Sequence, residues 1–491
     1  MNIAIDLGSH TSSAAYLAAG GLPTLISDPL TKDSRVGIPS IVLPVPNGAL
    51  VGQSVWHMVD SRPIAQPILH YAPEWLGTVQ ADLPVHWLPE TLVGLLVKKL
   101  KMDAETCTAS AITGISLVVP GYITQVQQQA LVQAVRLVDI PVHQVLSESD
   151  ALIEYYRPKG DRPIALITWS SNRLTVSLLQ KHDAGFKRLA TQTISGIGGD
   201  HWSQALSERI VSRSKSMLSL GGSIPLPSPV VESIQIELST ELVAYRTLVL
   251  QTELVEVVVT RRELEQLIRL DLPRATQTVL TCLNAAGMAP DAVGEVLIAG
   301  GSTLVPLVRQ WIGRLFSPDC LCYDHERLHA ALYGATLATH QPLLDTPASS
   351  LIGRTTHHIG VLALNPDTRE ITVDTVIRQY VPLPARGRRM YYTTVPNQPF
   401  LTIDVVQYQG TNSQQYDLLG RLSIGPLPTG SVHYAVEVEF SCSEDGLLAI
   451  RTTDPETGLE LAQQFQTETA TAFPFARQRK LVRETVVNGI G

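Results

Sequence analysis

The fold of this chain is decided close to its beginning, by the stretch NIAIDLGSHTSSAAYL at residues 2–17. It reads as an apolar strand, a tight turn and a second strand, with Asp6 near the end of the first strand and Gly8 in the turn. Successive backbone N–H groups in such a turn form a concavity that binds anions, and a carboxylate at its rim would hold a hydrated Mg²⁺. Because short glycine-containing motifs also occur in ordinary hairpins, the stretch alone leaves a phosphate loop and a plain hairpin open.

The same pattern returns at residues 164–179, IALITWSSNRLTVSLL, with the length and apolar rhythm of the first stretch. A repeat of this kind predicts two similar lobes around a cleft, each offering one hairpin. The second copy has lost the chemistry of the first. Thr168 takes the place of Asp6, serine takes the place of the turn glycine, and Trp169 adds bulk.

Strands and helices alternate from the first hairpin to about residue 340. The apolar spacing predicts strands at residues 114–120, 142–146, 255–260 and 294–299, and helices at residues 91–101, 124–138, 230–250 and 264–270. The segment SGIGGDHW (residues 195–202) is a glycine-rich turn that opens a helix, and Thr260–Glu263 is a capping box. Alternating strands and helices are typical of an α/β layer fold.

The sequence pattern changes after residue 341. From there on, short alternating or β-branched runs are bounded by turns that contain proline, glycine and asparagine. This pattern predicts a separate all-β domain. The predicted organisation is a first lobe at 1–158, a second lobe at 159–345, a linker at 346–353, the β domain at 354–462 and a polar C-terminal tail at 463–491.

Composition limits the classes of partner and location. The 491 residues, enough for about three domains, are 44% hydrophobic and 17% charged, with a net charge of −8. No basic run supports binding to nucleic acid or to anionic membrane. The five scattered cysteines are not a disulfide framework, and no signal peptide or membrane-spanning run is visible, so we expect a cytoplasmic protein.

Several segments, taken in order, match the motifs of a known chaperone family. IAIDLGSHTSS resembles its first phosphate loop, ISGIGGDHW its LGGEDFD turn, and VLIAGGSTLVPLVRQWI its adenosine-binding segment. PNQPFLTIDVVQYQG and VEVEFSCSEDGLLAIRTTDPETG resemble parts of its peptide-binding sandwich. Over about residues 1–460 the chain therefore resembles the heat-shock protein 70 family of the DnaK type.

This resemblance implies an actin-like (ribonuclease H-like) α/β nucleotide-binding domain of two lobes, followed by an all-β sandwich. In that family the two-lobed domain binds and hydrolyses ATP, and an apolar linker couples it to the grip of the sandwich on unfolded or extended polypeptide. The resemblance also implies ATP or ADP with Mg²⁺ as ligands, and J-domain or nucleotide-exchange cochaperones as partners.

The resemblance assigns roles to residues by position. Asp6 is the expected metal-shell carboxylate, and Glu148 the acidic residue near the attacking water. The expected nucleotide-binding residues are Gly8, Ser9, His10, Thr11, Gly198, Gly199, Glu232, Gln235, Ser239, Gly300, Gly301 and Ser302. The expected peptide contacts are Val361, Tyr392, Ile403 and Val405, with the alternative that each of these is only sandwich core.

Departures from the family motifs bear on catalysis. The family's catalytic lysine has no counterpart, since residues 33–97 contain no lysine. The second loop, TWSSNRLT, has Thr168 in place of aspartate and Arg173 in place of the catalytic threonine. Phosphoryl transfer depends on groups that position the phosphate and neutralise its charge, and one such group is worth roughly 10²–10³ in rate. The predicted hydrolysis is therefore weak or lost. No helical lid is visible after the sandwich.

Three functions remain open from the sequence. The first is a chaperone that binds ATP or ADP and hydrolyses it slowly. The second is a pseudo-ATPase that serves as a peptide-binding or assembly scaffold, in which Arg173 neutralises phosphate without Mg²⁺ or closes the site by pairing with Asp6. The third is a sugar or acetate kinase on the same fold, which would leave the β domain unexplained.

Overall fold

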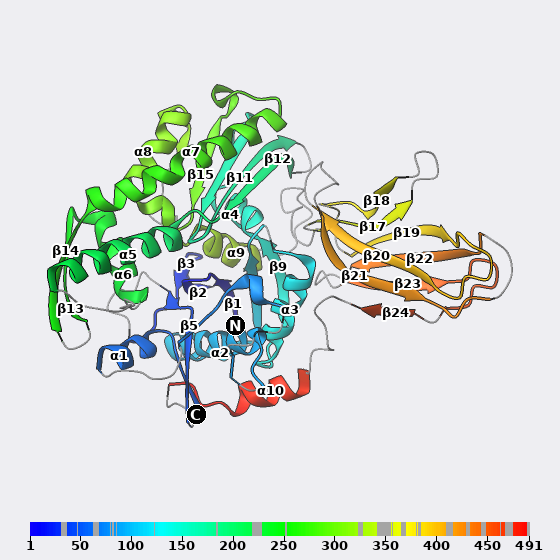
Figure 1. Cartoon of the computed structure of the whole chain (residues 1–491), viewed down its shortest axis with the longest axis horizontal. Helices are drawn as coiled ribbons and strands as arrows, with labels where there is room; N and C mark the ends of the chain where they lie inside the picture. The colour runs from blue at the N-terminus through cyan, green and yellow to red at the C-terminus, as the bar shows by residue number, and fades with distance from the viewer. Residues whose placement is uncertain are drawn as a thin grey trace. The chain divides into compact units, whose positions relative to one another are not determined.

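The computed structural model of the chain (Figure 1) describes residues 1–488 with gaps. The gaps are residues 31–36, 47, 62–67, 79, 81–82, 85, 122, 183–184, 219–227, 251–252, 323–327, 341–354, 356, 365–369, 380, 382–383, 409–415, 429–432, 443–447, 462 and 467–474. The predicted linker at 346–353 lies outside the described residues. The chain forms two compact units, one of residues 1–154 and 332–491 and the other of residues 155–331.

The first unit contains a mixed sheet of six strands in the order β3-β2-β1-β8-β9, with β4 paired to β2. These strands are β1 (Asn2–Leu7), β2 (Thr11–Leu17), β3 (Pro23–Leu25), β4 (Ile38–Pro39), β8 (Gly114–Val119) and β9 (Val142–Ser147). β1 runs antiparallel to β2 and parallel to β8, which runs parallel to β9. The predicted first hairpin is confirmed, and the carboxyl ends of β1, β8 and β9 share one edge of the sheet.

Helices and a small sheet complete the α/β part of this unit. The small sheet has the order β6-β5-β7, formed by β5 (Ile41–Val45), β6 (Gly48–Val51) and β7 (Leu69–His70). The helices are α1 (Gln53–Ser61), η1 (Pro73–Trp75), α2 (Pro89–Thr108), α3 (Gln125–Arg136), α4 (Glu148–Tyr156), α9 (Ala330–His340) and α10 (Phe475–Glu484). Apolar side chains of α2 and α3 pack with those of β1 and β8 in one buried cluster.

Helix α2 begins and ends where its sequence dictates. Pro89 occupies the first turn, where its missing N–H has no helical partner to lose, and Thr91 Oγ1 accepts the N–H of Leu88 at 2.9 Å. Ala109 ends the helix in the left-handed conformation, with φ of 49°. The predicted helix at 91–101 is confirmed and is longer than its apolar run.

The second unit repeats the strand pattern of the first. Its main sheet has the order β12-β11-β10-β15-β16, formed by β10 (Ile164–Trp169), β11 (Arg173–His182), β12 (Gly185–Ser195), β15 (Glu295–Ala299) and β16 (Leu321–Cys322). β10 runs antiparallel to β11 and parallel to β15, as β1 does with β2 and β8. The predicted second hairpin is thus confirmed.

The helices of the second unit bury one large core against this sheet. They are α5 (Gly199–Leu218), α6 (Ser228–Thr240), α7 (Arg261–Ala285), α8 (Pro306–Leu315) and the short η2 (Pro290–Ala292), η3 (Gly301–Leu304) and η4 (Pro318–Cys320). The capping box predicted before α7 is confirmed, because Glu263 N–H donates to Thr260 Oγ1 and Thr260 N–H donates to Glu263.

The predicted helix at 230–250 is wrong in its second half. α6 ends at Thr240, and β13 (Val243–Leu250) pairs antiparallel with β14 (Glu253–Thr260) as a two-stranded sheet. The valine-rich β14 needs a partner for its backbone groups, and residues 243–250 provide it. Pairing across the hairpin makes residues 243–250 a strand. The spacing of their apolar residues alone does not predict this pairing.

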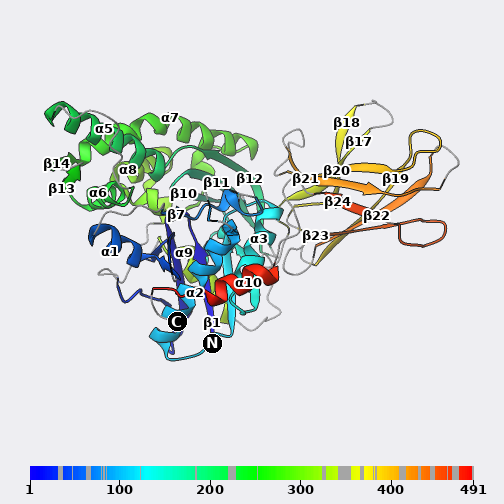
Figure 2. The ribbon, with the colours of Figure 1, turned by 60° about the horizontal axis from the view of Figure 1, so that its bottom comes forward.

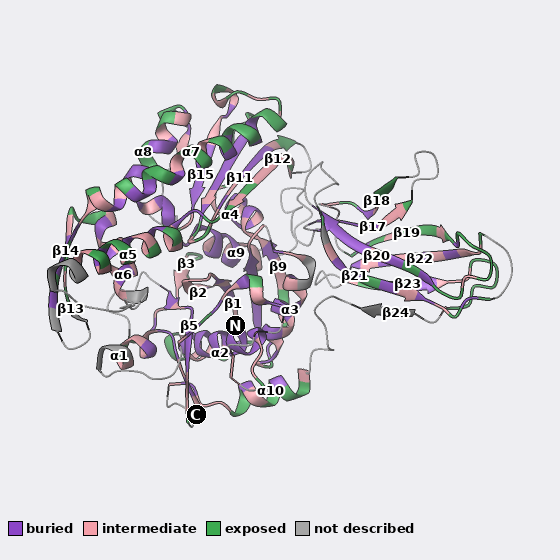
Figure 3. Ribbon diagram, in the orientation of Figure 1, coloured by how far each residue is buried: buried purple, intermediate pink, exposed green. Residues whose placement is uncertain are grey.

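The β-rich region forms a sandwich of two antiparallel sheets. One sheet has the order β18-β17-β20-β21-β24 and the other the order β19-β22-β23. The strands are β17 (His358–Leu364), β18 (Ile371–Ile377), β19 (Ala385–Tyr392), β20 (Leu401–Tyr408), β21 (Asp417–Ile424), β22 (Ala435–Cys442), β23 (Leu448–Thr453) and β24 (Gln463–Gln466). Alternate residues of both sheets share one buried core (Figure 3). β24 pairs with β21, so the sheet continues beyond residue 462.

Candidate functional site

The turn of the first hairpin is held tightly by its own backbone. Gly8 N–H donates to Thr11 O at 3.1 Å. A Cβ on Gly8 would lie 2.8 Å from that same oxygen, so only glycine fits. Ser9, His10 and Thr11 follow in the turn, as the resemblance implies for a phosphate loop.

Two buried serines brace this turn from behind. Ser40 Oγ donates to Gly8 O at 2.6 Å and lies 2.8 Å from Ser12 Oγ, while Ser40 N–H donates to His10 O. Sequence reasoning missed Ser40 because it lies in a proline- and glycine-rich stretch with no motif. Only the tertiary fold brings it under the hairpin.

Asp6 lies near the carboxyl end of β1, between Ser13 of β2 and Val118 of β8. Burial raises the pKa of Asp6 to about 6. The carboxylate is therefore ionised at neutral pH but poorly solvated, and a cation beside it would be stabilising.

Glu148 begins α4 directly after β9, so it lies at the same sheet edge as Asp6. Val119 pairs with Ser147, the residue before Glu148. Asp6 is level with Val118 and Leu146 across the sheet, so Glu148 follows two residues beyond that row. The structure thus places both residues predicted as catalytic at one edge of the first sheet.

Three loops of the second unit converge on the turn between β10 and β11. Ser302 Oγ donates to Ser170 O at 2.7 Å and accepts Gly199 N–H at 3.1 Å. A Cβ on Gly198 would lie 2.5 Å from Ser170 O. The predicted glycine-rich turn and the predicted Gly300–Ser302 turn are therefore packed against the second hairpin.

The residues predicted on α6 share one face of that helix. Glu232, Gln235 and Ser239 are spaced at i, i+3 and i+7. Ser203 of α5 donates to the side chain of Gln235, and a Cβ on Gly199 would lie 3.5 Å from Gln235 Nε2. The structure thus brings α6 to the glycine-rich turn, as expected if both serve one ligand.

The second hairpin has no carboxylate, as its sequence indicates. Thr168 pairs with Thr175 and Ala299 at the position matching Asp6. Arg173 begins β11, and its carbonyl accepts Ser170 N–H at 2.9 Å.

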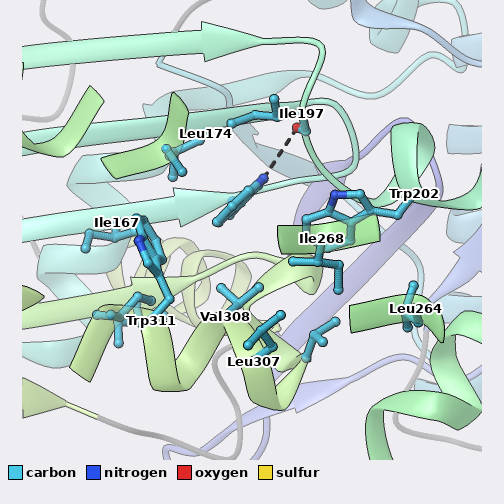
Figure 4. Packing of buried hydrophobic residues seen from close by; sticks show 14 of the residues in the cluster. Ile167, Leu174, Ile197, Trp202, Leu264, Ile268, Leu307, Val308 and Trp311 are labelled. Atoms are coloured by element: carbon cyan, nitrogen blue, oxygen red, sulfur yellow. Dashed lines mark hydrogen bonds between the residues drawn. The ribbon is translucent and has the colours of Figure 1, made fainter. Parts of the chain in front are cut away.

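Trp169 has a structural role beneath this hairpin. It is fully buried, and its Nε1–H donates to Ile197 O at 3.4 Å. Its ring meets those of Trp202 and Trp311 edge-on, with centroids 5.4 and 5.5 Å away. Figure 4 shows Trp202 and Trp311 in this buried cluster.

The residues predicted as peptide contacts divide into two groups. Val361, Ile403 and Val405 are buried in the sandwich core, as the alternative interpretation expects, whereas Tyr392 is half exposed. Peptide contact through these residues stays a prediction.

The described part of the chain holds neither a cluster of metal-binding side chains nor a helix fit to span a membrane. No three His, Cys, Asp or Glu side chains there gather as a metal-ligand set. No helix within those residues combines the length and hydropathy that spanning a membrane requires.

Comparison with known proteins gives one family. A family model described as "Hsp70 protein" matches residues 77–484. The chain is similar to the "Chaperone protein HscA homolog" of Tolumonas auensis, with 25% identity over 489 residues that span 94% of this chain and 77% of the relative. It is similar to the "Chaperone protein HscA" of Yersinia enterocolitica, with 26% identity over 500 residues and the same two coverages.

Proposed function

Because the chain belongs to the Hsp70 family, we propose that it is a chaperone that binds ATP or ADP through its α/β part and extended polypeptide through its β-sandwich. The observation that carries the nucleotide site is the convergence of Ser170, Gly199 and Ser302 in the second unit. The first hairpin, with its braced glycine turn, supplies a matching phosphate loop.

The proposed nucleotide-binding part is actin-like and two-lobed. The repeated hairpin, in which β1-β2-β8 and β10-β11-β15 share one pairing pattern, supports this arrangement. In this proposal Gly8–Thr11 bind phosphate from the first unit. Phosphate and adenosine are also bound by residues of the second unit, namely Gly198–Gly199, Gly300–Ser302 and the α6 face.

Mg²⁺ fits this site as a companion of the nucleotide. Asp6 is the one hairpin carboxylate, since its counterpart is Thr168. Mg²⁺ keeps several waters and binds through one or two carboxylates together with substrate phosphates, so a single, partly exposed carboxylate suits an ion that arrives with ATP. When bound, the ion would neutralise phosphate charge.

Hydrolysis in this proposal is weak or lost. The second hairpin supplies no carboxylate, Arg173 stands where the family has a threonine, and residues 33–97 contain no lysine. Glu148 remains at the sheet edge, where it would orient a water. A pseudo-ATPase scaffold is the second candidate, supported by these same departures.

Calorimetric titration with ATP and ADP, with and without Mg²⁺, tests the nucleotide site. We expect binding of both nucleotides, with only a modest Mg²⁺ dependence that Asp6→Asn removes. Ser302→Ala should weaken binding, because it releases the bridge between the Ser170 and Gly199 loops, whereas Ser441→Ala on the sandwich should not. Absence of heat and of any thermal shift in wild type would reject nucleotide binding.

Steady-state ATP turnover tests the proposal that hydrolysis is weak or lost. We expect phosphate release several orders of magnitude slower than in an ordinary Hsp70. Turnover at an ordinary rate that Asp6→Asn abolishes would contradict the weak hydrolysis. J-domain and nucleotide-exchange cochaperones remain proposed partners, and the cytoplasmic location remains a prediction.

A further inference from the structure

The C-terminal residues 475–488, here called the clasp, return to the first α/β region after the sandwich. Helix α10 packs on α2 (Figure 2), and hydrogen bonds join Gln478 of α10 to Thr91 of α2 and to His86 just before α2, both nearly 400 positions away. The sequence had indicated only a polar tail. The clasp is instead part of the core, since Val482 and Val487 are fully buried in the same cluster as β1 and α2.

Val482 fits a slot that α2 provides through a glycine. A Cβ on Gly94 would lie 2.9 Å from Val482 Cγ2 and 3.3 Å from Leu137 Cδ1. Glycine in the middle of a helix lowers helix stability, so Gly94 is unfavourable for α2 by itself. The close approach of Val482 accounts for it.

Polar contacts fix the orientation of α10 on α2. Thr91 Oγ1 donates to Gln478 Oε1 at 2.6 Å, and Gln478 Nε2 donates to His86 O at 2.9 Å. Lys98 Nζ donates to three carbonyls at the end of α10, those of Val482, Arg483 and Thr485, at 2.7 to 3.1 Å. A cation at the C-terminal carbonyls of a helix also complements the helix dipole.

The last residues of the clasp add to the edge of the small sheet. Ala49 N–H donates to Val486 O at 2.9 Å, and Asn488 N–H donates to Ala49 O at 3.0 Å. The Asn488 side chain accepts Val51 N–H at 2.8 Å and donates to Val51 O. β6 is the edge strand, so the clasp pairs backbone groups that would otherwise be open.

Helix α9, which precedes the sandwich in the chain, is anchored to the same region. Thr339 Oγ1, near the end of α9, donates to Ser116 Oγ of β8 at 2.7 Å and accepts from Gln144. The sandwich, from β17 to β24, therefore lies in the chain between two segments that are both fixed to the first α/β region.

We propose that the clasp is a restraining strap that holds the sandwich on two tethers. Only residues 467–474 separate β24 from α10, so Gln466 stays within about 30 Å of Phe475 while the clasp is seated. Without the clasp, only the connection to α9 limits how far the sandwich moves from the first α/β region. The strap does not depend on nucleotide binding.

Spin-label distances in the full-length protein without nucleotide test the strap. Labels go on Cys107, which is exposed at the end of α2, and on a cysteine introduced at exposed Leu459 of the sandwich, in a Cys322→Ser background. Wild type should give a distance distribution whose upper limit is set by the two tethers. Val482→Asp places a charge in the Gly94 slot and should broaden the distribution toward longer distances. Lys480→Ala, on the exposed face of the same helix, should not.

Limited trypsin cleavage within α10 shows independently whether the clasp is released. We expect Val482→Asp to accelerate cleavage at Arg479 and Lys480 at least tenfold, because cleavage follows the population of the open state. A variant truncated after Pro474 lacks the clasp altogether. An unchanged distance distribution in that shortened chain would overturn the strap, as would wild-type cleavage as fast as in Val482→Asp.

Discussion

At the scale of single residues, Asp6 is the group whose ionisation matters most. Its pKa in the folded state is about 6, against 3.8 for the unfolded chain. Between pH 4 and 6 the folded state therefore binds more protons than the unfolded chain does. The free energy of unfolding falls as pH rises through that window. Above pH 6 the ionised, poorly solvated carboxylate destabilises the ligand-free protein.

Asp6→Asn should stabilise the ligand-free protein at pH 7.5 by roughly 1–3 kcal/mol, because it removes this charge. Urea unfolding of the α/β region at pH 4.5 and pH 7.5 measures the effect. The gain should shrink toward pH 4.5, where Asp6 is largely protonated. A variant that loses stability at pH 7.5 relative to wild type would show that the carboxylate already has a compensating partner.

His357, just before β17, is a second residue with a shifted pKa. Burial, with a smaller contribution from the neighbouring His358, lowers the pKa of His357 to about 3. The unfolded chain takes up the proton near pH 6.5, so sandwich stability should fall as pH decreases from about 6.5. Hydrogen exchange of β17 at pH 5 and 7, corrected for intrinsic rates, should show lower protection at pH 5. The difference should vanish in His357→Gln and persist in exposed His433→Gln.

At the scale of elements, helix α2 carries a buried ion cluster. Lys99 Nζ lies 2.6 Å from Asp103 Oδ1 and 3.3 Å from Asp28 Oδ1, and all three side chains are buried. Burial raises the pKa of Asp103 to about 6, although Lys99 opposes this. The lysine thus keeps two buried carboxylates compatible with the core.

Lys99→Met should destabilise the protein by about 3–5 kcal/mol at pH 7.5, because it leaves buried charge uncompensated. Lys101→Met in the same helix is the matched control, since its pair with Glu105 has the same i, i+4 spacing but is partly exposed. The control should lose less than about 1 kcal/mol in urea unfolding. Equal losses for both variants would contradict the assigned role of Lys99.

The boundaries of helices and strands show which local sequence signals suffice to predict secondary structure. The capping box before α7 and both hairpins were predicted correctly, because each depends on neighbouring residues. The segment 243–250 was assigned to a helix wrongly, because its strand character depends on pairing with β14. Ser40 was missed for the same kind of reason, since its contacts with Gly8 and Ser12 span 32 and 28 residues of the chain.

At the scale of the whole molecule, the chain has separate hydrophobic cores. The first α/β region, the second unit and the sandwich each have their own buried cluster. All six tryptophans lie outside the sandwich, at positions 56, 75, 87, 169, 202 and 311. Tryptophan fluorescence therefore reports on the α/β part alone.

Unfolding should consequently depart from a single two-state transition. We expect the fluorescence transition and the far-ultraviolet circular dichroism transition in urea not to coincide. Saturating ATP should shift the fluorescence transition to higher urea, because a ligand stabilises the unit that binds it. Coincident transitions that move together with ATP would indicate one cooperative unit.

The sequence by itself determined the local and repeated features of this protein: the two hairpins, the glycine turn beside Asp6, the missing carboxylate at Thr168, and the change from α/β to all-β texture. These follow from residue spacing and turn chemistry over a few neighbours. Only the tertiary structure decided the serine bracing of the first turn, the convergence of three loops on Ser302, and the return of the clasp to Gly94. Each of these joins segments far apart in the chain, and no local pattern encodes which distant surface a side chain will fill.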